Sequence, residues 1–209
     1  MKAFLTAVTA AGSGVLRASL ASEPGSRRFR VLAGTVAATW FAGARAAGPV
    51  PRGRPDVVQP VLAGAGAFGV FYGCALVARR IPVLRRAITG VLSHGSTPTV
   101  VTTALVTGAA EEVFFRGALY DAFGARGSTA AYVLSTTATR NPALVLASAV
   151  MGTLFTLQRR RAGGLQAPVL THVTWSALMI GFLPRLFGPP LAQQSPPDQP
   201  GESDQQQRL

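Results

Sequence analysis

Two adjacent carboxylates, Glu111 and Glu112, lie in one of the more apolar parts of the chain and are followed by an arginine, Arg116. Between residues 57 and 197 the only other acidic residue is Asp121. A carboxylate at the centre of a lipid bilayer is costly, so it almost always faces the interior of a helix bundle and marks function. Because nearly all the acidic residues of this region fall within one helical turn, we expect a functional site there.

The spacing of these residues predicts how their charges are paired. On a helix, Glu112 and Arg116 are four positions apart and lie on one face, so we expect an ion pair between them. Glu111 points about 100° away from Glu112, so the arginine serves it less directly. One carboxylate is then left unneutralised, and it either takes up a proton or meets another cation, which is how acid and base roles are separated. A purely structural ion pair is the alternative interpretation.

His172 is the other ionisable residue deep in an apolar segment, in the stretch LTHVTWSALM. Ser176 lies four positions further on and shares its helix face, and Trp175 lies three positions on. A histidine in this setting serves as a metal ligand, a proton shuttle or a donor to an oxyanion. A hydrogen-bonded core histidine is the alternative that the residues alone leave open.

The composition indicates that these residues are positioned by membrane-spanning helices. Of the 209 residues, 48% are hydrophobic and 13% are charged, and the mean hydropathy is +0.32. A soluble domain usually carries about 25% charged residues. The apolar runs are too long and numerous for a soluble Ala/Gly-rich helical protein. The lone cysteine, Cys74, lies in one of these runs, so no disulfide framework is expected.

The net charge of +12 comes almost entirely from arginine, since Lys2 is the only lysine. The arginines fall between the apolar segments, where such residues set topology and contact anionic lipids. We therefore expect a lipid bilayer as partner and no nucleic acid. An Arg-heavy, Ala/Gly-rich composition with one lysine is typical of proteins from GC-rich bacteria, so the expected location is a bacterial plasma membrane.

The apolar runs predict an all-α, polytopic transmembrane bundle of five to six spanning helices. A helix over residues 57–78 reaches about 33 Å, enough to cross a hydrocarbon core of about 30 Å. Between the second and third spans, arginines alternate with apolar residues, which predicts an interfacial amphipathic helix over residues 79–94. The five stronger spans are 31–47, 57–78, 100–123, 141–158 and 165–187, and the weaker one is 128–139.

The flanks of the bundle are predicted to lie outside it. Residues 1–30 hold a mildly apolar run that Gly12, Ser13 and Gly14 interrupt and Arg17 follows, so we expect a cytoplasmic or interfacial leader. Residues 31–187 form the transmembrane domain. Residues 188–209 are rich in proline and glutamine and are expected to be a disordered tail.

The motif EEVFFRGALY resembles the Glu-Glu-x-x-x-Arg-Gly signature of the CAAX prenyl protease and bacteriocin-processing family, also called Abi or type II CAAX endopeptidases. THVTWS, about 60 residues downstream, is similar to the family's final His-x-x-x-Asn motif. The resemblance implies an intramembrane bundle that hydrolyses a peptide bond without a covalent intermediate. It implies that Glu111 is the general base, that Glu112 and Arg116 brace the helix, and that His172 contributes to a metal or oxyanion site.

Two motif positions differ from the family pattern. In FTLQR, Phe155 is in place but Arg159 stands where the family's middle motif has histidine, and Ser176 stands where its last motif has asparagine. A catalytic zinc ion normally has three protein ligands. Three outcomes are open: cleavage by Glu111, His172 and oxyanion donors alone, a metal such as zinc held by His172 and Glu111, or an inactive relative.

These observations lead to two main functional hypotheses. The first is an intramembrane endopeptidase that acts on membrane-associated peptides or proteins. The second is a catalytically inactive relative that binds peptides or partner proteins in the membrane. A transporter with Glu111 in a proton relay ranks last, because neither paired broken helices nor repeated halves are evident.

Overall fold

The computed structural model describes residues 1–23, 25–92 and 98–187, and over these ranges the chain forms helices without a strand. The predicted all-α fold is thereby confirmed. The predicted disordered tail at residues 188–209 lies outside the described residues. In chain order the helices are α1 Lys2–Leu20, α2 Arg27–Ala47, α3 Val58–Ala78, α4 Pro82–Leu92, α5 Pro98–Glu112, the π-helix η1 Val113–Leu119, α6 Tyr120–Thr137, α7 Pro142–Ala162, α8 Gln166–Phe182 and the 3-10 turn η2 Leu183–Leu186.

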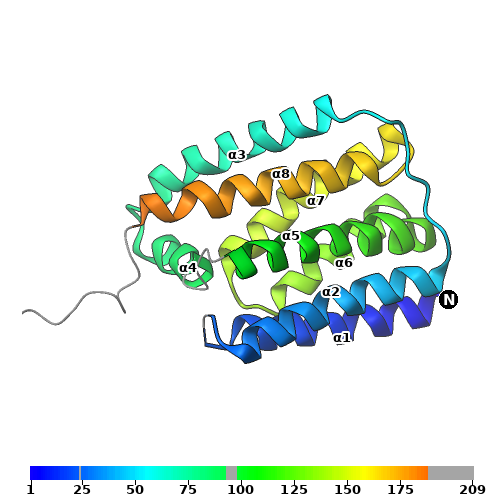
Figure 1. Cartoon of the computed structure of the whole chain (residues 1–209), viewed down its shortest axis with the longest axis horizontal. Coiled ribbons are helices and arrows are strands. Elements are labelled where there is room, and N and C mark those ends of the chain that lie inside the picture. The colour runs from blue at the N-terminus through cyan, green and yellow to red at the C-terminus, as the bar shows by residue number, and fades with distance from the viewer. Residues whose placement is uncertain (24, 93–97, 188–209) are drawn as a thin grey trace, which may run out of the picture.

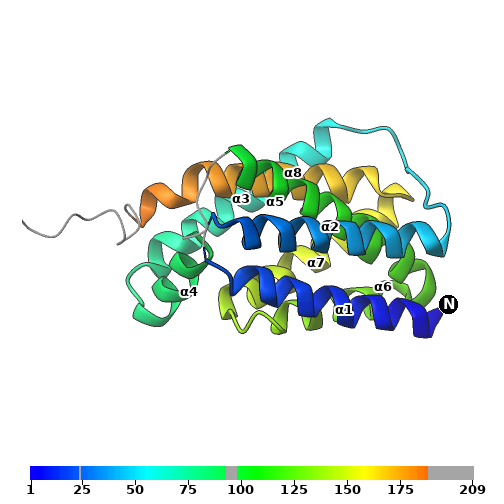
Figure 2. The ribbon, with the colours of Figure 1, turned by 60° about the horizontal axis from the view of Figure 1, so that its bottom comes forward.

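The helix carrying the two carboxylates lies in the middle of the bundle. Figure 1 shows α5 between α2 and α8, with α1 beside α2 and α3 beside α8. The pair α6 and α7 packs against η1, and α7 also packs against α8. In Figure 2 this pair lies below the row formed by α2, α5 and α8. Elements from several parts of the chain therefore surround the motif helix.

Residues 100–123, predicted as one spanning helix, are helical throughout, and the stretch contains a π-helix. The α-helix α5 ends at Glu112, the wider turns of η1 follow, and the backbone leaves the helical region at Gly124, with φ 72° and ψ −179°. Glycine adopts such a positive φ without the strain that a side chain would bring. Beyond it, Ser128 hydrogen-bonds to the carbonyl oxygen of Phe115, so the chain doubles back along the motif helix. The weak run at 128–139 thereby packs onto the site.

The core lies beside the motif, where α1, α2 and η1 meet. Trp40 of α2 is fully buried, and its ring centroid lies 4.9 Å from that of Phe114 and 5.0 Å from that of Phe115. Leu5 of α1 joins the same cluster with 1% of its surface exposed. These two phenylalanines are two of the three residues between the carboxylates and Arg116 in the motif. Core packing therefore fixes the orientation of the helix that carries them.

The segment predicted as a leader contributes a helix to the bundle, because α1 packs along α2. In the sequence, Gly12 interrupts an apolar run. In the structure, a Cβ atom on Gly12 would overlap the ring of Trp40. The missing side chain is what lets α1 approach α2, so the predicted boundary at residue 30 separates two helices that pack together.

Three helices of the described part are long and apolar enough to cross a membrane: Lys2–Leu20, Val58–Ala78 and Gln166–Leu186. The second and third overlap the predicted spans 57–78 and 165–187, whereas the first was not predicted as a span. The predicted spans 31–47 and 141–158 are helical in α2 and α7, but terminal arginines lower their mean hydropathy. The predicted amphipathic helix at 79–94 corresponds to α4, and its interfacial position stays a prediction.

The role of Gly12 gives a prediction for stability. Gly12→Ala should lower the free energy of unfolding by about 1–3 kcal/mol, because the added methyl group overpacks the contact with Trp40. Gly14→Ala is the matched control, since no atom lies within 4 Å of a Cβ built there, and it should be neutral or stabilising. Thermal unfolding of both variants in detergent checks this. Equal stability of the two would show that α1 does not pack on Trp40.

Candidate active site

Glu112 and Arg116 form the predicted ion pair at the centre of the bundle. Nη1 of Arg116 lies 3.2 Å from Oε1 of Glu112, and both side chains are fully buried. The pair bridges the end of α5 and the π-helix η1. A π-helical turn inside an α-helix is uncommon and occurs frequently at functional sites. The predicted pairing at four positions therefore holds although the backbone between the two residues is not a regular α-helix.

Aromatic rings enclose the guanidinium group of Arg116. Its Cζ lies 4.1 Å from the ring centroid of Tyr132 and 5.1 Å from that of Phe155. A guanidinium over an aromatic face gains a cation–π interaction, which is stronger when water is excluded. Gly152 of α7 leaves room for this arrangement, since a Cβ there would lie 2.9 Å from Tyr132 Cδ1 and 3.0 Å from Arg116 Nη2. Arg116 is thus held in place by packing as well as by charge.

His172 joins this pair from α8. Its Nδ1 lies 2.8 Å from Oε1 of Glu112, the same oxygen that receives Arg116. The imidazole also stacks on Phe155, with ring centroids 4.8 Å apart and planes 15° apart. An ionised carboxylate only accepts hydrogen bonds, so Nδ1 carries the proton and donates to Glu112. That assignment leaves Nε2 with a lone pair in the neutral ring.

Glu111 lies on a different face of the helix from Glu112, as the predicted separation of about 100° requires. Tyr132 of α6 donates its hydroxyl hydrogen to Oε2 of Glu111 over 3.2 Å. Within the described part of the chain, the Glu111 side chain makes no other hydrogen bond to protein. The two neighbouring carboxylates therefore have different partners, one a cation and an imidazole, the other a neutral phenol.

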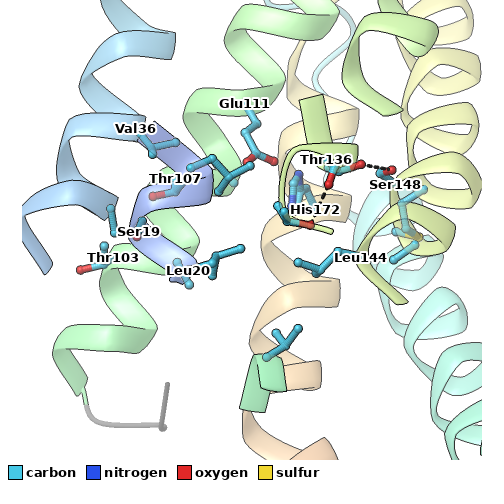
Figure 3. Close-up of a pocket in the computed structure, with 18 of the residues that line it drawn as sticks. Ser19, Leu20, Val36, Thr103, Thr107, Glu111, Thr136, Leu144, Ser148 and His172 are labelled. Carbon is cyan, nitrogen blue, oxygen red and sulfur yellow. Dashed lines mark hydrogen bonds between the residues drawn. The ribbon is translucent and has the colours of Figure 1, made fainter. Parts of the chain in front are cut away.

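A cavity of about 240 Å³ lies beside Glu111 and His172. Figure 3 shows the carboxylate of Glu111 pointing toward His172, with the side chains of α1, α2, α5, α6 and α7 around the space. Most of the wall is apolar. Its polar groups, besides these two residues and Tyr132, are the Trp175 indole and the hydroxyls of Ser19, Thr103, Thr107, Thr136, Thr139 and Ser148. The site thus combines one ionisable end with a largely apolar chamber.

Arg159, which stands at the motif position for histidine, is turned away from this cavity. Its Nε donates to the carbonyl oxygen of Arg116 over 2.9 Å, and its Nη2 lies 3.0 Å from Oδ1 of Asp121. Its guanidinium also covers the ring of Tyr120. Arg159 therefore ties α7 to η1 and to the start of α6. Ser176, at the position of the motif asparagine, is likewise not among the residues that line the cavity.

The side chains present do not fit a catalytic zinc site. The described residues contain no group of three or more His, Cys, Asp and Glu side chains that could hold a metal ion. At the cavity the donors are Glu111 and Nε2 of His172, since Glu112 does not line the cavity and its Oε1 is bonded to Arg116 and to Nδ1 of the same histidine. Catalytic zinc sites normally use three protein ligands. Metal binding at His172 stays a prediction that this donor set does not favour.

Sequence reasoning missed two residues of the site. Tyr132 contacts both Glu111 and Arg116, and Gly152 leaves the space that Tyr132 and Arg116 occupy. Tyr132 is a polar aromatic residue within the weak apolar run at 128–139, and that was the available signal. The contacts of Tyr132 with Glu111 and Arg116 depend on the reversal of the chain at Gly124. Residue spacing alone does not reveal that reversal.

A comparison with family models places the site in a known family. Residues 93–178 match the model described as Type II CAAX prenyl endopeptidase Rce1-like, which covers less than half of the chain. The match includes the paired carboxylates, Arg116 and His172, and confirms the resemblance inferred from the motifs. The matched family is a protease family, and the apolar helices of the described part agree with a membrane protein. Neither the curated proteins nor the solved structures contain a match to this chain.

The different partners of the two carboxylates predict different effects on stability. Glu112→Gln should lower the free energy of unfolding by about 3–5 kcal/mol, because it leaves the buried charge of Arg116 without its counterion. Glu111→Gln is the matched control and should cost less than about 1.5 kcal/mol, the usual upper value for one hydrogen bond. Denaturant unfolding in detergent, followed by tryptophan fluorescence, measures both. Equal losses would contradict the assignment of Glu112 as the structural member.

Proposed function

We propose that the chain is an endopeptidase that hydrolyses peptide bonds of membrane-associated peptides or proteins with a water molecule activated by Glu111. The proposed location is a bacterial plasma membrane. One observation carries the proposal: Glu111 and His172 line the same cavity, inside a domain of a protease family. The neighbouring Glu112 is neutralised by Arg116, which leaves Glu111 as the carboxylate available for proton transfer.

The proposed reaction begins with water between Glu111 and the substrate carbonyl. Glu111 accepts one proton as the water oxygen bonds to the carbonyl carbon, and the carbonyl π electrons move to the oxygen. Nε2 of His172 accepts a hydrogen bond from the other water hydrogen and orients the attack. When the tetrahedral intermediate collapses, the C–N bond breaks and Glu111 delivers its proton to the leaving nitrogen. General acid–base catalysis of this kind contributes about 10²–10⁴-fold to a rate.

Glu112 and Arg116 support this chemistry without touching the substrate. The bond from His172 Nδ1 to Glu112 fixes both the tautomer and the direction of the ring. Arg116 balances the charge of Glu112, so the imidazole is held by a neutral pair. A base that is oriented by a third group follows the arrangement seen in many hydrolases.

The cavity supplies groups that suit a bound peptide. Thr107 Oγ1 and Trp175 Nε1 are buried, line the cavity, and make no hydrogen bond to any residue in the described part of the chain. An unpaired buried donor is costly unless a ligand or water completes it. We assign their unused hydrogen-bonding capacity to the carbonyl oxygens of a peptide bound in the cavity. The apolar remainder of the wall favours apolar side chains over charged ones.

Arg159 supports a second candidate function. The family's middle motif has histidine at this position, whereas here the guanidinium is committed to the carbonyl oxygen of Arg116 and to Asp121. A chain that lost this histidine would keep the polar cluster for folding and for holding a peptide or a partner protein. In that case Glu112 would matter for stability, and replacement of Glu111 would leave the biological role unchanged.

Cleavage of membrane-anchored peptides by the purified protein in detergent separates the two functions. The proposal predicts that Glu111→Gln and His172→Ala each lower kcat/KM at least about 100-fold, since each removes a group that acts on the attacking water. Glu23→Gln is the matched control, because Glu23 is exposed and lies outside the cavity. Wild-type protein that cleaves prenylated and unprenylated peptides no faster than the two variants would reject the endopeptidase and favour the peptide-binding function.

A further inference from the structure

The hydroxyl group of Tyr132 is the described hydrogen-bond partner of the Glu111 side chain. The residue belongs to α6, and its hydroxyl reaches Glu111 because the chain reverses at Gly124 and returns along η1. Tyr132 also lines the cavity, although only 7% of its surface is exposed. A buried phenol that meets the reacting carboxylate inside the cavity is placed to influence the reaction.

The ring of Tyr132 is held on two sides, which fixes the position of its hydroxyl. One face covers the guanidinium of Arg116 at 4.1 Å, and the ring packs edge to face with Phe115 at 5.0 Å between centroids. Phe115 itself is in contact with Trp40 in the core. A tyrosine has few rotatable bonds, so these contacts leave its hydroxyl little freedom. Tyr132 thus presents a donor at a defined place beside Glu111.

We infer that Tyr132 is a positioning residue of the hydrolytic site, an inference that rests on the proposed function. Its hydroxyl holds Oε2 of Glu111, so that Oε1 is directed to the attacking water. A glutamate side chain has three rotatable bonds and without this bond samples other orientations in the cavity. A displacement of a reacting group by about 1 Å costs about 10²-fold in rate.

The position of Tyr132 matters because the two residues that differ from the family motifs, Arg159 and Ser176, supply no polar group at the cavity. Arg159 is bonded to Arg116 and Asp121, and Ser176 does not line the cavity. The described contacts therefore leave the orientation of Glu111 to Tyr132, which belongs to none of the three motifs. In this chain α6, rather than α7, provides the group that holds the proposed base.

Tyr132→Phe tests the inference, because it removes the hydroxyl and keeps the ring that packs on Arg116 and Phe115. We expect kcat to fall between about 10-fold and 100-fold, with KM within about twofold of the wild type, since substrate binding is untouched. Tyr120→Phe is the matched control. Its ring packs on Arg159 and it lies outside the cavity, so its kcat should equal that of the wild type.

Two further measurements separate positioning from a structural role. In a Glu111→Asp background, whose shorter side chain no longer reaches Tyr132, Tyr132→Phe should cause no additional loss of kcat. The infrared difference spectrum between wild type and Tyr132→Phe should contain carboxylate bands that disappear when Glu111 is replaced by Gln. This second readout does not depend on turnover.

The outcomes distinguish the inference from the proposed function. Wild-type turnover with an equal kcat in Tyr132→Phe overturns the inference and leaves the endopeptidase standing. The same loss in the wild-type and Glu111→Asp backgrounds also overturns it, because the tyrosine would then act independently of Glu111. Absence of wild-type turnover overturns the proposed function and the inference that rests on it, and the infrared bands then report only the hydrogen bond.

Discussion

One oxygen of Glu112 receives both Nη1 of Arg116 and Nδ1 of His172, and the side chains of Glu112 and Arg116 are fully buried. Three ionisable groups from α5, η1 and α8 are brought together by this contact. An unpaired charge at this depth would cost several kcal/mol, so the elements must pack in the arrangement that completes the pair. The rings of Tyr132 and Phe155 then close over the guanidinium. Two groups that line the cavity, His172 and Tyr132, are held by this arrangement.

The same contact gives two adjacent glutamates different roles. The charge of Glu112 is neutralised by Arg116 and its side chain is fully buried. Glu111 instead lines the cavity, and its hydrogen-bond partner is the phenol of Tyr132. The π-helix after Glu112 carries Arg116, and the carbonyl oxygen of Arg116 accepts a hydrogen bond from Arg159. Arg159 therefore supports the backbone of the site at the position where the family motif has a histidine.

Much of the site can be predicted from the sequence, because residue spacing and the free-energy cost of burying charge both constrain it. The four-residue interval predicted the pair of Glu112 and Arg116, and the cost of charge in an apolar segment singled out His172. The contact between His172 and Glu112 joins residues 60 positions apart, and nothing local specifies which of two carboxylates an imidazole meets. Gly12 was misjudged for a related reason. A glycine that interrupts an apolar pattern and a glycine that admits a tryptophan ring have the same sequence signature.

The different roles of the two glutamates require that Glu111 is reachable from the cavity and that Glu112 is not. A hydrophobic carbodiimide, which modifies the carboxyl groups it can reach, tests this when the labelled protein is digested and the peptide over residues 111–116 is fragmented in a mass spectrometer. We expect modification at Glu111, with Glu112 unmodified until the protein is unfolded. Labelling of Glu112 in the folded protein at a rate equal to that of Glu111 would contradict it.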